Sequence, residues 1–100
     1  MKKIEISLEY GCFPVWLYDD AGSLADTTLP SEASDDIELL GLFNDIQARF
    51  EATFINNSQE FTDKGFASKE EERSFYKDLD VAVEKLNSHC SGLYEIVKLY

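Results

Sequence analysis

The stretch from Tyr10 to Gly22 constrains the fold most, because it holds two glycines, a proline and the single tryptophan of the chain. Pro14 has no N–H to donate, so a new segment should begin near it, at or beside a sheet edge. Val15-Trp-Leu-Tyr18 is short and rich in β-favouring residues, which predicts a strand. The residues Asp19 to Gly22 predict a turn that follows this strand, with Gly22 at positive φ.

The pattern leaves open which face of the sheet the tryptophan occupies. Val15 and Leu17 share one face of the predicted strand, and Trp16 and Tyr18 share the other. If the aliphatic pair faces the core, the two aromatic rings lie on the open face beside an acidic turn. Rigid aromatic anchors with a charged rim are typical of binding hot spots. If the register shifts by one residue, Trp16 belongs to the core instead.

Periodicity predicts the remaining elements. Alternation predicts a strand over residues 2–10, and β-branched and aromatic residues predict another over 93–100. Shorter strands are predicted over 23–27 and 60–62. These strands and two helices predict an α+β fold in a single domain spanning 1–100: a mostly antiparallel sheet of four to five strands with both helices packed on one face.

Each predicted helix has a recognisable start. Ser34 is expected to cap the first helix, with Asp35 and Asp36 in the first turn. Its apolar face should run from Leu39 at three-to-four spacing, through to residues 53 and 54. A Ser-x-x-Glu capping box at Ser68 should begin the second helix, which continues to about residue 88.

The charge distribution points to a basic partner. The net charge is −11, and residues 4–48 contain no Lys or Arg. This window carries ten acidic residues: Glu5, Glu9, Asp19, Asp20, Asp26, Glu32, Asp35, Asp36, Glu38 and Asp45. Such a surface repels nucleic acid and anionic membrane and attracts basic proteins. Solubility of a small protein is the alternative explanation for the acids.

Several functional classes lack support in the residues. No apolar run reaches the ~18 residues of a membrane span, and the N-terminus has no signal-peptide core, which predicts a cytoplasmic protein. Cys12 and Cys90 are expected to be reduced. His89 and Cys90 supply too few ligands for a zinc site. Neighbouring side chains also point in different directions, which argues against a Cys–His nucleophile pair. No metal, cofactor or catalytic group is therefore expected. The acids near residues 19–26 lack EF-hand spacing.

The chain resembles a family of small acidic bacterial immunity proteins of about 100 residues. The resemblance begins with the run Tyr10-Gly-Cys-Phe-Pro-Val-Trp-Leu-Tyr-Asp19 and Leu29-Pro30. It continues through Leu42–Gln47, Phe54–Asn57 with Glu60-Phe61, Gly65-Phe66 and Ser68–Glu72. Such proteins are encoded beside polymorphic or contact-dependent growth inhibition toxins. The resemblance implies a cytosolic inhibitor of a cognate toxin, without enzyme activity or cofactor.

The expected partner is a basic toxin domain, such as an RNase, bound 1:1. The resemblance supplies no binding residues, so the interface is inferred from charge and aromatic content: Trp16, Tyr18, Asp19, Asp20, Asp26, Glu32, Asp35 and Asp36. A non-enzymatic adaptor module that binds another basic protein is the alternative function. The terminal strand 93–100 could also pair across a two-fold axis if it lies at a sheet edge.

Overall fold

The described residues form a four-stranded sheet, two long helices and a separate pair of short strands. The computed structural model describes residues 2–56, 61–63 and 65–100. The elements are β1 (Lys2–Ile6), β2 (Val15–Tyr18), β3 (Leu24–Asp26), the 3-10 helix η1 (Ser31–Ala33), α1 (Ile37–Glu51), β4 (Phe54–Asn56), β5 (Phe61–Asp63), α2 (Lys69–Cys90) and β6 (Tyr94–Lys98). The main sheet has the order β3-β2-β1-β6, and β4 pairs with β5 apart from it.

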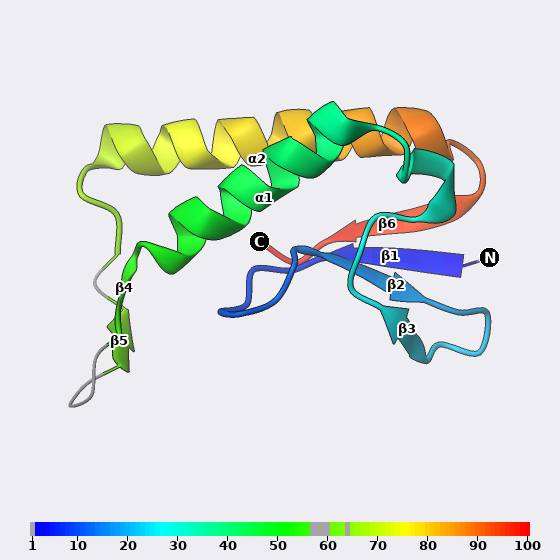
Figure 1. Cartoon of the computed structure of the whole chain (residues 1–100), viewed down its shortest axis with the longest axis horizontal. Helices are drawn as coiled ribbons and strands as arrows, with labels where there is room; N and C mark the ends of the chain where they lie inside the picture. Colours follow the sequence, from blue (N-terminus) through cyan, green and yellow to red (C-terminus); the bar gives the residue numbers. More distant parts are fainter. Residues whose placement is uncertain (1, 57–60, 64) are drawn as a thin grey trace.

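Both helices lie on one side of this sheet (Figure 1), which confirms the predicted α+β fold. β1 is antiparallel to β2 and parallel to β6, so the sheet is mixed but mostly antiparallel. The core lies between the sheet and the helices. It is built from buried aliphatic side chains of β1 and β2 and the inward faces of α1 and α2: Ile4, Ile6, Val15, Leu39, Phe43, Ile46, Phe75, Leu79, Ala82, Val83 and Leu86.

The first strand is shorter than the alternation over 2–10 predicts, because β1 ends at Ile6. The N–H of Ser7 donates to the carbonyl oxygen of Pro14 at 3.0 Å, which closes the connection to β2. Within the connection, Gly11 has φ of 77° and its N–H donates to the Glu51 carboxylate at 2.8 Å. The loop is therefore anchored on the end of α1. The alternating residues that follow Ile6 form this loop and do not continue the strand.

The first helix begins two residues later than predicted. Asp36, not Ser34, is the N-cap, and its Oδ1 accepts the Leu39 N–H at 2.9 Å. Ser34 instead ends η1, where its hydroxyl donates to the carbonyl oxygen of Ser31 at 3.0 Å. Asp35 and Asp36 thus precede the first helical turn. Pro30, buried at the start of η1, favours this extra turn because its φ is already fixed near the helical value.

The segment between the helices is partly described. Phe54 was expected on the face of the first helix, but it begins β4 because α1 ends at Glu51. The strand predicted over 60–62 corresponds to β5. Residue 60, the first residue of that predicted strand, lies outside the described residues. The capping prediction for α2 is confirmed, since the Ser68 hydroxyl accepts the Glu71 N–H at 3.1 Å.

Candidate partner-binding surface

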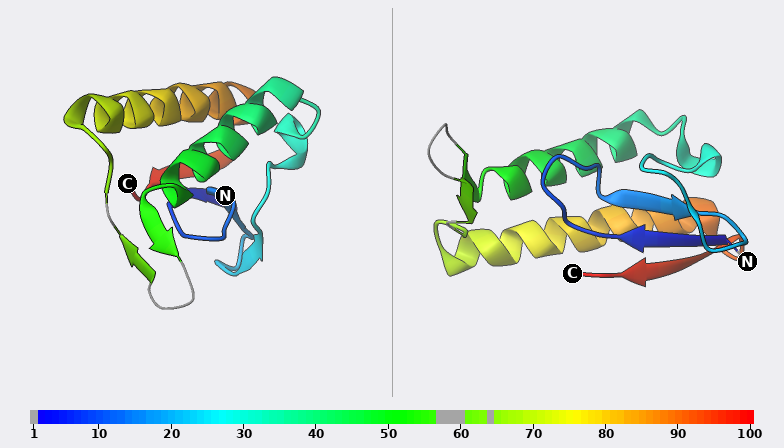
Figure 2. Two further views of the ribbon diagram at one scale, coloured as in Figure 1. Left: turned by 60° about the vertical axis from the view of Figure 1, so that its left-hand side comes forward. Right: turned by 90° about the horizontal axis from the view of Figure 1, so that it is seen from below.

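The register between β1 and β2 decides which face Trp16 occupies. Ile6 pairs with Val15, and both are fully buried under the helices. Side chains alternate along a strand, so Trp16 and Tyr18 point to the opposite face. In the part of the chain that the structure describes, no helix covers that face (Figure 2). Of the two arrangements left open by the sequence, the structure has the one with the aromatic pair on the uncovered face.

Tyr18 is held in place by two charged neighbours on β1. Its hydroxyl donates to the Glu5 carboxylate, and the Lys3 ammonium lies 4.8 Å from the centre of its ring. Lys3 Nζ and Glu5 Oε2 are 3.1 Å apart. The bonds to Lys3 and then to Tyr18 lower the pKa of Glu5, and the same carboxylate raises the pKa of Tyr18. An aromatic ring fixed in this way loses little conformational entropy when a partner binds.

Trp16 offers mainly carbon atoms to a partner. The side chain is half-buried, and its indole nitrogen is inaccessible, with no acceptor among the described residues. Beside it on the uncovered face, Leu24 of β3 pairs with Tyr18 and is 50% exposed. Leu24 extends the aromatic strip toward the sheet edge. The sequence pattern predicted the strand that contains Leu24 but did not indicate its face.

The turn after β2 uses one of its aspartates as a structural group. Asp19 Oδ1 accepts the N–H groups of Ala21 and Ser23, each at 2.9 Å. Gly22 follows with φ of 83°, as the turn prediction requires. Asp26, at the end of β3, accepts the N–H of the following residue at 2.8 Å. Both acids are exposed, so these bonds fix the carboxylates while leaving their charge at the surface.

Two of the acids predicted to contact a partner also join elements within the protein. Asp36 caps α1 and its Oδ2 lies 2.9 Å from His89 Nε2, at the end of α2. The bond from the backbone N–H at the cap, followed by the His89 contact, lowers the pKa of Asp36. Glu32 of η1 accepts the Tyr94 hydroxyl at 2.9 Å. Burial, and then this bond, raises the pKa of Tyr94 to about 12.

These roles predict a pH-dependent loss of stability. Asp36 has a folded pKa below its ordinary value of 3.8, so the unfolded chain takes up its proton first as the pH falls. Its stabilising contribution is complete above about pH 5 and is lost as the pH falls through and below 4. Asp36→Asn keeps a good N-cap but removes this titration. In urea titrations, the stability difference between wild type and D36N should therefore shrink from pH 6 to pH 3.

Asp35 provides the matched control for that experiment. It is exposed, and no hydrogen bond or ion pair joins it to another described residue. Asp35→Asn should change the free energy of unfolding at pH 7 less than D36N does. A constant difference between wild type and D36N over the whole pH range would contradict the structural role of Asp36.

Two acids distant in the sequence meet in a hollow at one end of the sheet. The hollow has a volume of about 290 Å³ and is lined by Lys2, Asp20, Glu32, Leu93 and Tyr94. Leu93 is 54% exposed there, so the acidic groups adjoin an apolar surface. No sequence pattern indicates the last two lining residues, because contacts between distant parts of a chain leave no local signal.

The acidic window is less uniform in space than in the sequence. Among the described residues, three Lys or Arg side chains from outside it form ion pairs with its acids: Lys3 with Glu5, Lys85 with Glu38, and Arg49 with Asp45. The acids of the β2–β3 region, η1 and the start of α1 lie toward one end of the molecule (Figure 1). Five of the six predicted contact acids are exposed, and Asp36 is half-buried; the exposed ones are Asp19, Asp20, Asp26, Glu32 and Asp35.

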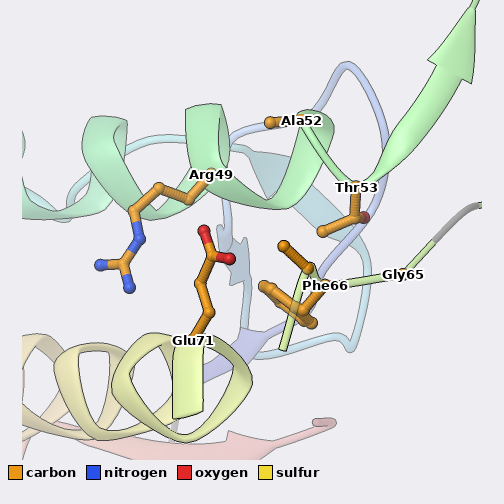
Figure 3. Close-up of a pocket in the computed structure, with 7 residues that line it drawn as sticks. Arg49, Ala52, Thr53, Gly65, Phe66 and Glu71 are labelled. Carbon is orange, nitrogen blue, oxygen red and sulfur yellow. The ribbon is translucent and has the colours of Figure 1, made fainter. Parts of the chain in front are cut away.

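A second pocket lies between the end of α1 and the start of α2 (Figure 3). It has a volume of about 380 Å³, and its charged lining groups are Arg49 and Glu71. Arg49 binds Asp78 at 2.7 Å and lies 5.5 Å from the centre of the Phe75 ring, so its charge is used to join the two helices. The described lining offers no nucleophile with a base beside it.

The His89-Cys90 pair likewise has separate structural roles. Cys90 is fully buried, and burial raises the pKa of its thiol, which makes it a poor nucleophile. His89 points to Asp36 at the surface. Among the described residues, no group of three or more His, Cys, Asp or Glu side chains could hold a metal ion.

Comparisons with known protein families and curated proteins found no match. Neither α1 nor α2 is long and apolar enough to cross a membrane.

Proposed function

We propose that this protein inhibits a basic protein domain by binding it with the uncovered face of the sheet and the adjoining acidic end. The proposal rests on the position of Trp16 and Tyr18 on the uncovered face. An exposed acidic turn begins directly after Tyr18. The resemblance to immunity proteins makes the partner a bacterial toxin, such as an RNase. Inhibition of this kind needs contact with the toxin domain and no chemical step.

Electrostatics supports a nuclease as the partner. A nuclease needs a basic cleft to hold phosphate groups, and an acidic protein can occupy that cleft. Asp19, Asp20 and Asp26 present carboxylates over a short span beside the aromatic residues. Opposite charges on two proteins raise the association rate at low salt, and aromatic contacts then slow dissociation. The two parts of the surface therefore contribute to different steps of binding.

Charge reversal at the acidic end tests the electrostatic part. Asp26→Lys with Asp35→Lys should lower the association rate constant for a cognate basic toxin domain by about 3–10-fold at low salt. Stopped-flow or surface-plasmon measurements over a salt series would measure it. The rate should also become less dependent on salt, because fewer attractive charges remain to be screened.

The matched control is Glu70→Lys with Glu72→Lys, which changes the net charge equally. Both acids lie in the first turn of α2 and are exposed. If both double variants slow association equally, net charge rather than the acidic end directs binding. If the basic domain binds but deletion of the protein leaves growth protection unchanged, the adaptor function replaces inhibition.

A further inference from the structure

β6 is an edge strand with unused hydrogen-bonding groups. Its single neighbour among the described strands is β1. Just beyond β6, the Leu99 N–H donates to the Ile6 carbonyl oxygen at 2.9 Å, toward β1. Backbone groups alternate sides along a strand, so the N–H and carbonyl groups of Ile96 and Lys98 point away from β1. An edge of this kind is a template for another strand, and β6 has neither a proline nor a bulge to prevent pairing.

The sequence around β6 is self-complementary about Ile96. Leu93 and Leu99 flank the strand at equal distance from this residue, and each is 54% exposed. In an antiparallel pair of two β6 strands centred on Ile96, Leu93 of each copy lies opposite Leu99 of the other. The same register places Lys98 opposite Tyr94. No like charges face each other, and two exposed apolar residues gain a partner at each end.

Charge also favours this edge for contact between two copies. Each chain carries −11, so two copies repel one another in general. β6 itself contains one acid and one base, Glu95 and Lys98, and Lys98 Nζ is 3.2 Å from Asp80. β3 and the acid at its end, Asp26, lie at the opposite edge of the sheet in the order β3-β2-β1-β6, whereas Asp20 of the β2–β3 turn lines the hollow beside Leu93. Pairing at β6 brings together two strands that carry no net charge, and it keeps the β3 edges of the two copies apart.

We infer that two copies of this protein form a two-fold symmetric dimer by antiparallel pairing of their β6 strands, centred on Ile96. The two four-stranded sheets become one continuous eight-stranded sheet with all four helices on the same face. This dimer does not depend on the proposed inhibitory function. Each copy keeps its acidic edge available, so a toxin would bind with one molecule per chain.

A charge-swap experiment at the flanking leucines tests the register. Wild-type protein should show a mass that rises with concentration toward twice the monomer value in sedimentation equilibrium. Leu93→Lys with Leu99→Lys places like charges opposite each other twice, so the dissociation constant should rise about tenfold or more. Leu93→Glu with Leu99→Lys places opposite charges there and should restore pairing. The first variant lowers the net negative charge, so general repulsion cannot explain weaker association.

Leu24→Lys is the matched control, because Leu24 is similarly exposed but lies on β3 at the other edge. It should dimerise like wild type. Amide hydrogen exchange gives an independent measurement: the Ile96 and Lys98 N–H groups should exchange more slowly as protein concentration rises. A monomeric wild type at all concentrations, or equal dimerisation by L93K/L99K, would overturn the proposal. Failure of L93E/L99K to recover would overturn the Ile96-centred register.

Salt separates this dimer from the toxin complex. Salt screens repulsion between two acidic copies, so the dimer should strengthen as ionic strength rises. Association with a basic domain should weaken under the same conditions. Because the two equilibria respond in opposite directions and to different variants, either can fail while the other is observed.

Discussion

Replacing Phe43 with Ala is expected to lower the free energy of unfolding by about 3–5 kcal/mol, the usual cost of deleting a large buried ring. Phe43 is fully buried on the inner face of α1, and its ring centre lies 6.0 Å from that of Phe13. The cavity would open between a helix and the sheet, where the core contains Ile4 and Val15. Since small domains have about 5–15 kcal/mol in total, F43A should lose a large fraction of the stability of the protein.

Urea denaturation followed by circular dichroism measures this loss. Leu40→Ala is the matched control, because Leu40 lies on the same helix but points toward solvent. Its cost should stay within about 1 kcal/mol. Equal destabilisation by F43A and L40A would contradict the assignment of the buried face of α1.

Replacing Trp16 with Ala is expected to weaken binding of the toxin domain by about 30-fold or more, as for other central aromatic residues of interfaces. The loss should appear mainly in the dissociation rate, because the charges that direct association remain. Trp16→Phe keeps an aromatic ring at the same place and should lose less. The affinity can be measured by isothermal titration calorimetry for both variants.

The fluorescence of Trp16 gives a second measurement of partner binding. Trp16 is the only tryptophan of the chain, so its fluorescence is specific for the uncovered face of the sheet, apart from any tryptophan of the partner. Binding should protect it from acrylamide quenching. Both variants must first be shown to have native circular dichroism, since the side chain is half-buried. Wild-type affinity in folded W16A would show that the interface lies elsewhere.

Much of the fold could be predicted because local patterns decide it. β2 spans Val15–Tyr18, as its β-favouring residues predict, and Gly22 has the expected positive φ. The capping residue Ser68 begins α2. In each case the determinant is a residue type whose backbone preference or side-chain bond acts within a few positions.

The differences arise where a distant contact competes with a local pattern. The alternation over 2–10 favours a long strand, yet α1 binds the Gly11 N–H through Glu51 and turns the chain after Ile6. Ser34 and Asp36 are both good cap residues. The 3-10 turn after Pro30 uses the first, and His89 contacts the second.

The candidate surface was predictable in composition but not in geometry. The sequence indicates an aromatic pair beside acids, yet the face of Trp16 depends on pairing with β1, which no local pattern specifies. The contact between Glu32 and Tyr94 joins residues 62 positions apart. Lys85 reaches Glu38 from another helix, so the acidic window in the sequence overstates the unpaired charge on the surface.

The central position of β1 has a consequence for how the protein is made. β1 precedes the other described elements in the sequence, and one of its two neighbours, β6, follows all of them, with Ile4 paired to Ile96. Contacts between residues so far apart close slowly, because almost the whole chain must first be brought together. The sheet can therefore be completed only after β6 has been synthesised. Until then one side of β1 stays without its β6 partner, and deletion of β6 would remove that partner altogether.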